Sequence, residues 1–380
     1  MRLVALVLEQ PEQTVFQRLR EWYLDAKHKS GKKRQELDVT SCFAPLLRWI
    51  VRLWENGNRQ MVLVLDATTL GERWTILSIS VVIRSCAIPV AWKVLGGHEK
   101  GSWRPHWEGL LMHLEGSIPA DWQVLVMADR GLYARWLFQA ICACGWHPFL
   151  RLNLGVKARA VGEETFDWIS RWTPTPGTSW KGVVECFAGK ASRVKGTLLM
   201  HWEPGYEHPW IVLTDLSPQE AEVCWYGMRT WIEGGFKDFK RGLWGWHHSK
   251  MLEASRVERL WLAMAVAQLW TVSLGCQAEV EHQPKDPGAY LPATHIARKR
   301  RKRPAGQPPE RRLSCVVRGR LGLVAALFKA EVLPCGRLLG DAWPETITAP
   351  RKLPSASALH QRERKRAQKR RARARARTAA

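Results

Sequence analysis

The sequence predicts an α/β protein built on a mixed sheet flanked by helices. Three short, apolar, strand-like segments come first, at the spacing of hairpins. Helical and strand-like segments then alternate, and a stretch rich in strands and turns interrupts this alternation before helical segments return. Strands are expected at 61–70, 74–83, 86–95, 122–131 and 147–154, and helices at 105–115 and 134–145.

The charge balance predicts a polyanionic partner. The 380 residues carry 58 Lys and Arg against 35 Asp and Glu, a formal net charge of +23. The last thirty residues hold twelve Lys and Arg and one Glu. So dense a run of like charge is not expected to fold alone, and it would bind a phosphate backbone through counterion release. The 22 Trp residues include candidate platforms for unpaired bases, although more than half are expected in the core.

Two features bear on the compartment. No run of eighteen apolar residues occurs, so no membrane span or membrane partner is expected. The nine Cys residues are scattered and lack the spacing of a zinc site, which indicates reduced thiols in a cytosolic protein.

The patterns divide the chain into five regions. The helical segments before the first strand, at 11–27 and 43–54, form either a small DNA-contacting unit or a cap on the main domain. An apolar helix is also expected at 252–275, and a short helical segment near 315–330. The regions are an N-terminal helical region (1–60), the first part of the α/β core (61–154), a β-rich insertion (155–216), the helical second part of the core (217–275) and a basic, Pro- and Arg-rich C-terminal region (276–380), partly disordered.

Acidic residues lie at or near the C-terminal ends of two strands that are expected to be neighbours. Asp66 lies in the first strand segment, and Asp129 closes the fourth. A lone acid in such a place is most often a loop residue or a helix cap. Because ligands of α/β sheets gather at the C-terminal ends of strands, two such acids predict a shared site.

The stretch 217–246 carries the other candidate residues. Ser217, Pro218 and Glu220 form a capping box, which predicts that a helix starts at Ser217. Farther on, Tyr226, Arg229 and Glu233 follow at i, i+3 and i+7, so they would share one helical face, and Lys240 would return to that face two turns later. The alternative for such a pattern is a solvated face with weak mutual attraction. A carboxylate suited to a metal beside cations suited to phosphate favours nucleic-acid chemistry.

These residues resemble the ribonuclease-H-like DDE transposases of bacterial insertion sequences. Tyr226, Arg229, Glu233 and Lys240 match the signature Y-x2-R-x3-E-x6-K of the cut-and-paste branch that has a β-rich insertion before its catalytic Glu. The stretches ADRG around Asp129 and PWIVLTD at 209–215 also resemble that branch. The similarity spans about residues 60 to 275.

The resemblance implies a catalytic triad of Asp66, Asp129 and Glu233 that binds two Mg²⁺ or Mn²⁺ ions. The reaction would be cleavage of transposon ends, through a DNA hairpin, and joining of 3′-hydroxyls to target DNA. The triad would act on double-stranded DNA, within a homodimer that synapses two ends. The compartment would be the bacterial cytoplasm, at the nucleoid.

The resemblance also implies DNA-binding roles. Tyr226, Arg229 and Lys240 would contact phosphates near the cleaved end, and Trp210 would stack on a flipped base. The alternative for Trp210 is an indole that closes the core of the insertion. Arg130 either orients a neighbouring group of the site or is a plain surface charge.

Two departures from the family stand out. Gly234 and Gly235 follow the candidate catalytic Glu, where the family has bulkier residues, and they are expected to weaken or kink the helix. The region before the first strand is short. The alternatives to a transposase are a ribonuclease-H-like structure-specific nuclease and an inactive, domesticated DNA-binding protein.

Overall fold

The computed structural model describes residues 9–281 and 313–347, with residues 33, 56, 100, 173, 174, 205 and 341 excepted. The expected basic segments at 298–312 and 351–380 lie outside the described residues.

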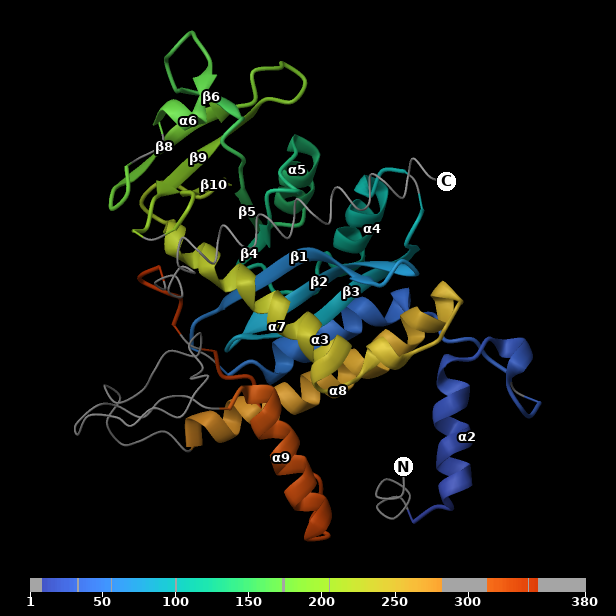
Figure 1. Cartoon of the computed structure of the whole chain (residues 1–380). Helices are drawn as coiled ribbons and strands as arrows, with labels where there is room; N and C mark the ends of the chain where they lie inside the picture. Colours follow the sequence, from blue (N-terminus) through green and yellow to red (C-terminus); the bar gives the residue numbers. More distant parts are fainter. Residues whose placement is uncertain are drawn as a thin grey trace, which may run out of the picture.

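The protein is a mixed α/β fold built on one ten-stranded sheet (Figure 1). Its strand order is β3-β2-β1-β4-β5-β10-β9-β8-β6-β7. The first three strands form antiparallel hairpins, and β4 pairs in parallel with both β1 and β5. The five strands expected before residue 155 are confirmed, at β1 Gln60–Leu70, β2 Trp74–Ile83, β3 Cys86–Gly96, β4 Gln123–Ala128 and β5 His147–Arg151.

The β-rich stretch 155–216 extends the same sheet. Its last strand pairs antiparallel with β5, which joins the inserted strands to the core strands without a break (Figure 1). The elements are β6 Lys157–Ala160, β7 Asp167–Trp168, the short helix α6 Ile169–Trp172, β8 Ser179–Cys186, β9 Val194–His201 and β10 Trp210–Thr214.

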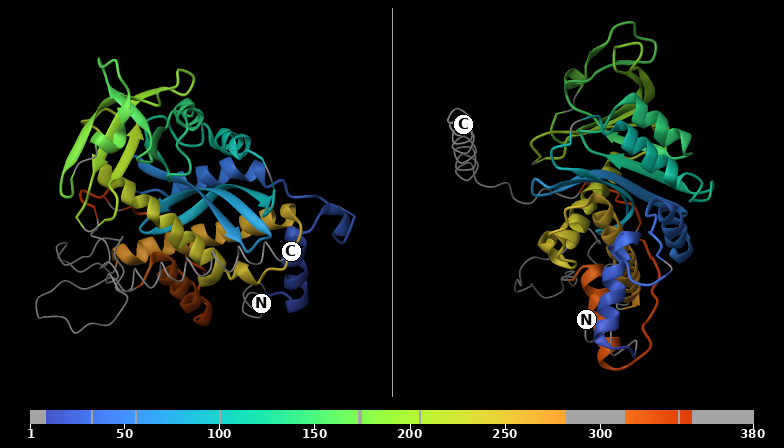
Figure 2. Two further views of the ribbon diagram at one scale, coloured as in Figure 1. Left: turned by 45° about the horizontal axis from the view of Figure 1, so that its top comes forward. Right: turned by 90° about the vertical axis from the view of Figure 1, so that its right-hand side faces the viewer.

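Helices cover both faces of the core strands. Figures 1 and 2 show α4 and α5 on one side, and α7 and α8 on the other. The helices expected in the core and near both ends of the described chain are confirmed. They are α2 Glu12–Tyr23, α3 Phe43–Leu53, α4 Arg104–Leu114, α5 Arg135–Ala143, α8 Ala254–Glu281 and α9 Cys315–Phe328.

The N-terminal helices pack on the core, which does not decide between a DNA-contacting unit and a cap. Helix α3 contacts α4 and β3, and α2 contacts α8. The buried Arg259 guanidinium donates to the carbonyl of Tyr23 and to the Asp25 carboxylate, which fixes the end of α2 to α8.

Helix α8 is a core helix of this fold. Among the described residues it alone has the length and composition of a membrane span, but 67% of its apolar window is buried inside the structure. It packs on β3, where Trp92 lies against Trp261 and Trp261 meets Phe239 and Trp246. These indoles fill the core, as expected for part of the tryptophans.

The prediction that a helix starts at Ser217 is wrong, because helical structure begins at Val223. The Ser217 hydroxyl does donate to the Glu220 carboxylate at 2.7 Å, yet this contact closes a turn. The turn places Leu216 and Ala221 in the buried apolar cluster on the sheet. Tertiary packing therefore outweighs the local capping signal. The helical stretch consists of a 3-10 helix, η3 Val223–Thr230, then α7 Trp231–Lys237, and a π-helical segment, η4 Asp238–Gly242.

The two glycines after Glu233 allow close packing and do not interrupt α7. A Cβ atom on Gly235 would lie 2.6 Å from the Ala87 Cβ in β3, and one on Gly234 would lie 3.3 Å from the Ser85 carbonyl oxygen. The expected weak point falls later, where the α-helix widens into η4. The absent side chains let α7 lie directly against the β2–β3 hairpin.

Gly235→Ala should therefore destabilise the protein by about 1–3 kcal/mol, because the methyl group overpacks the contact with Ala87. Gly109→Ala in α4 is the matched control, since apart from the neighbouring backbone of its own helix no atom lies within 4 Å of its added Cβ. That control should be neutral or stabilising by up to about 1 kcal/mol. Urea unfolding followed by circular dichroism measures both, and equal effects would contradict the packing role.

Candidate active site

The strand register aligns three charged residues on neighbouring strands. The β1–β4 ladder ends at the pair Leu65↔Ala128, and the β4–β5 ladder ends at Ala128↔Leu150. The next residues along these chains are Asp66, Asp129 and Arg151. Strand β1 itself continues to Leu70, paired with β2 alone.

The alternation of side chains sends these charges to one face of the sheet. Successive strand residues point to opposite faces, so the side chain of Asp66 lies on the same face as those of Val62 and Val64. In the same way, Asp129 shares a face with Met127, and Arg151 shares a face with Phe149. These apolar residues all belong to the buried cluster beneath η3 and α7. The charged row thus lies where the apolar face ends.

Helix η3 is fixed to this row by Tyr226. The phenol is 3% exposed and donates a hydrogen bond to the Ala128 carbonyl oxygen at 3.2 Å. The Arg151 guanidinium lies over its ring, 5.5 Å from the centroid. Burial raises the pKa of Tyr226 to about 12, so the phenol is a neutral donor at physiological pH. Tyr226 thus positions the residue one 3-10 turn later, Arg229, over the acids.

The Arg229 guanidinium contacts all three acids that the sequence singled out. Its Nη2 lies 2.7 Å from Asp66 Oδ2 and 3.6 Å from Asp129 Oδ2, and its Nη1 lies 3.2 Å from Glu233 Oε1. The side chain of Arg229 is 12% exposed, against 19% for Asp66, 46% for Asp129 and 67% for Glu233. The predicted acids therefore converge on one cation from three separate elements.

Burial dominates the electrostatics of Asp66. Desolvation raises the pKa of its carboxyl, and the charges of Asp129 and Glu233 act in the same direction. Arg229 and the Ala67 N–H oppose this shift but do not cancel it. Asp129 is held differently, because its Oδ1 accepts from the Gly131 N–H at 2.8 Å.

The other predicted cations lie around this cluster. Lys240 is partly buried, which lowers the pKa of its ammonium together with the charge of Arg241, and Asp66 opposes that shift. Its charge therefore acts at the acid cluster. Arg130 directly follows Asp129, and its side chain is exposed. Its backbone carbonyl accepts from Asn153 Nδ2 at 3.2 Å, which braces the loop after β4.

Arg151 is a site residue that the sequence reasoning missed. Burial lowers the pKa of its guanidinium, and its buried Nε has no hydrogen-bond partner among the described residues. Its Nη2 makes a long contact of 3.4 Å with the Pro209 carbonyl oxygen, and the guanidinium lies over the Tyr226 ring. The sequence does hold one signal for it. Side chains two residues apart in a strand share a face, so Arg151 lies on the face of the apolar Phe149 once β5 is paired with β4.

Trp210 does not offer a free ring surface in this structure. The indole is 7% exposed and lies edge-on between Tyr206 and Tyr226, with centroids 5.8 and 5.7 Å away. It is also the first residue of β10. This is the placement that the alternative interpretation expects, an indole closing a core. Base stacking by Trp210 stays a prediction, and it requires the ring to be uncovered.

The donor chemistry of the three acids fits Mg²⁺ or Mn²⁺, which prefer carboxylate oxygens. As they stand, however, no three Asp, Glu, His or Cys side chains in the described part of the chain are close enough together to share one ion. The Arg229 guanidinium contacts each of the three carboxylates in this structure. A metal ion bound by the same oxygens would have to take its place.

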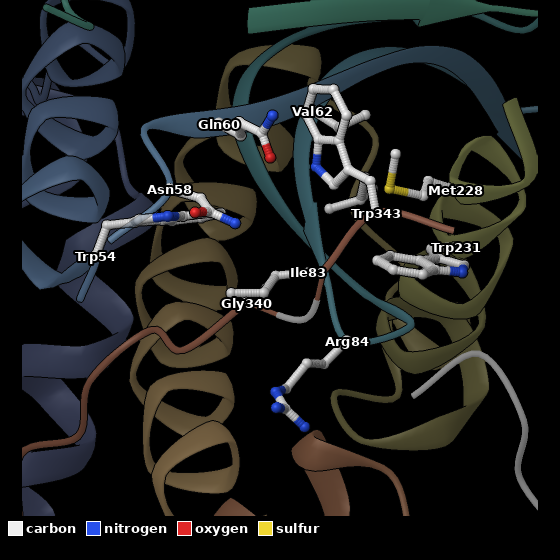
Figure 3. A pocket seen from close by; sticks show the side chains of 11 residues that line it. Trp54, Asn58, Gln60, Val62, Ile83, Arg84, Met228, Trp231, Gly340 and Trp343 are labelled. Atoms are coloured by element: carbon white, nitrogen blue, oxygen red, sulfur yellow. The ribbon is translucent and has the colours of Figure 1, made fainter. Parts of the chain in front are cut away.

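A pocket is lined in part by residues of η3 and α7 (Figure 3). Met228 and Trp231 line it from η3 and α7, Gln60 lines it from the start of β1, and Trp343 lines it from the C-terminal segment. That segment also braces η3, because the Trp343 ring packs on Trp225 with centroids 4.8 Å apart. None of the three acids lines the pocket, so it lies among the residues that pack against η3 and α7.

Comparisons with known proteins give distant matches of structure alone. No family model matches the sequence, and no curated protein sequence matches it either. Among solved structures, the chain is similar to the piggyBac transposase in a synaptic complex with hairpin DNA, with a TM-score of 0.32 and 10% identity over 60% of this chain and 55% of that chain. It is also similar to human ENDOV, with a TM-score of 0.24 and 14% identity over 60% of this chain and 98% of that one. The chain therefore spans about half the length of that transposase chain, and scores this low carry no argument about function.

Because folding raises the pKa of Asp66, its ionised carboxylate lowers the free energy of unfolding of the metal-free protein at neutral pH. A carboxyl whose pKa is raised by folding contributes stability below its unfolded pKa, about 3.9, and loses it as the pH rises through the folded value. In EDTA, Asp66→Asn should therefore melt above wild type at pH 7, with the difference shrinking towards pH 4. Thermal unfolding across this range measures it.

Asp38→Asn is the control of opposite sign. The Thr40 hydroxyl lowers the pKa of Asp38, so this variant should melt below wild type at pH 7. An Asp66→Asn variant that is less stable than wild type at neutral pH would contradict the assignment.

Proposed function

We propose that this protein is a DDE-type transposase with a ribonuclease-H-like catalytic domain. It cleaves transposon ends and joins their 3′-hydroxyls to target DNA by metal-dependent phosphoryl transfer. The observation that carries the proposal is the convergence of Asp66, Asp129 and Glu233 on one guanidinium, from β1, the end of β4 and α7. The order β3-β2-β1-β4-β5, with two parallel pairs beside two hairpins, supports the fold assignment.

The three carboxylates would hold two Mg²⁺ or Mn²⁺ ions. Such ions activate the attacking oxygen and stabilise the leaving oxygen of an in-line displacement. Asp66 is the most buried of the three, so it suits the ligand shared by both ions. Glu233, the most exposed, is the acid with most freedom to adjust.

The cations around the acids would bind the DNA backbone. Arg229 and Arg151 supply guanidinium forks that match phosphate oxygens, and Lys240 supplies a point charge. Tyr226 keeps its hydroxyl on β4, so its role is to position η3. Two DNA ends have to be held together, hence we propose a homodimer in the DNA complex, acting in the bacterial cytoplasm.

Asp66→Asn, Asp129→Asn and Glu233→Gln should each reduce Mn²⁺-dependent nicking of a supercoiled plasmid by at least about 100-fold. Each change keeps the shape of the side chain but removes the charge that attracts the ions. DNA affinity in EDTA, measured by fluorescence anisotropy, should not fall more than about threefold below that of wild type, because the phosphate-binding cations are intact.

Glu222→Gln is the matched control for these variants, because Glu222 pairs with Lys181 away from the cluster. Near-wild-type nicking by any triad variant would remove that residue from the triad. A joining assay with a pre-cut end of the DNA flanking the reading frame separates a transposase from a nuclease, since only the former joins that end to a target.

Lys240→Gln and Arg151→Gln should weaken DNA binding and make it less sensitive to salt. A residue that contacts a phosphate contributes about one unit to the slope of log affinity against log salt concentration. Each slope should therefore fall by about one. Arg159→Gln is the control, since Arg159 is paired with Glu185 in the inserted strands. A slope unchanged from wild type would rule out direct phosphate contact.

A further inference from the structure

We infer that Arg229 is an exchangeable counter-cation. It holds the three acids together in the free protein, competes with divalent metal for them, and passes to a DNA phosphate when metal binds. Metal loading and DNA binding are thereby coupled through one side chain. The inference rests on the proposed function, because it assigns the site a divalent metal and a DNA backbone.

The first step is that guanidinium and metal cannot share the acids. Arg229 Nη2 donates to Asp66 Oδ2 at 2.7 Å, and Nη1 donates to Glu233 Oε1 at 3.2 Å. A metal ion bound by these carboxylates needs the oxygens on which those donors now lie. With the guanidinium in place, no three Asp, Glu, His or Cys side chains in the described part of the chain are close enough together to share an ion.

The second step is that the displaced guanidinium needs another anion. Beyond the acids, two further cations lie near it, because Arg130 directly follows Asp129 and the Arg151 guanidinium lies over the ring of Tyr226, one turn before Arg229. The buried Nε of Arg229 has no hydrogen-bond partner among the described residues. A guanidinium released into such surroundings is poorly stabilised until a phosphate arrives, and its fork suits phosphate oxygens.

The third step is thermodynamic. If DNA stabilises the displaced state of Arg229, DNA raises the affinity of the acids for metal, and metal raises the affinity for DNA by the same factor. The acids would thus bind metal efficiently only when a DNA backbone is bound beside them. The metal-loaded site would then form mainly in the DNA complex.

Isothermal titration of the full chain with Mn²⁺, with and without a duplex of the flanking DNA, tests the inference. Without DNA, Arg229→Gln should bind Mn²⁺ at least about tenfold more tightly than wild type, because the charge-assisted bonds to the acids are gone. With DNA, the Mn²⁺ affinity of wild type should rise by a larger factor than that of the variant.

Two further variants keep the test sharp. Lys240→Gln removes a neighbouring positive charge without removing a bond to the acids, so its gain in Mn²⁺ affinity should be much smaller. Arg229→Lys keeps the charge but loses the fork, and it should fall between wild type and Arg229→Gln. Circular dichroism establishes that each variant is folded.

The outcomes separate the inference from the proposed function. Mn²⁺ binding that is lost in Asp66→Asn, together with equal or weaker affinity in Arg229→Gln than in wild type, overturns the exchange and leaves the metal site standing. A gain in Lys240→Gln as large as that in Arg229→Gln also overturns it, since charge alone then explains the effect. Absence of Mn²⁺ binding in every variant, even with DNA, overturns both.

Discussion

The parallel pairing of β1, β4 and β5 is the constraint on which the rest of this structure depends. Because both ladders end at the same level, the residues just beyond them form a row, and strand alternation sends that row to one face. A shift of one residue in either ladder would turn one charge to the opposite face. Backbone hydrogen bonds of the sheet therefore place Asp66 and Asp129, whereas Glu233 comes from α7.

Acidic side chains at the end of an apolar face lose contact with water, so nearby groups have to neutralise part of their charge. The η3–α7 segment supplies such a group, since Tyr226 fixes the segment to β4 and Arg229 neutralises part of the acidic charge. The compensation is incomplete, as the raised pKa of Asp66 shows. Incomplete compensation is expected where residues are kept for chemistry at some cost in stability.

Some local signals in the chain were decisive and others were overridden. The apolar runs before residue 155 specified their strands, because a short buried β-branched segment has few alternatives. The capping box at Ser217 formed its side-chain contact but started no helix, because Leu216 and Ala221 had to reach the sheet. The pair Gly234 and Gly235 suggested a kink. The position of Ala87 in the tertiary structure shows instead that they allow α7 to pack closely on β3.

The sequence by itself determined the order of strands and helices, because composition, period and spacing are local properties. It also singled out the three acids, through their resemblance to a family motif. It also placed Tyr226, Arg229, Glu233 and Lys240 within one segment. Only the tertiary structure decided that Arg229 lies among the acids, that Arg151 joins them and that Trp210 is enclosed by two tyrosines. Those outcomes depend on which strands pair and how a helix crosses them, and contacts between distant segments set both.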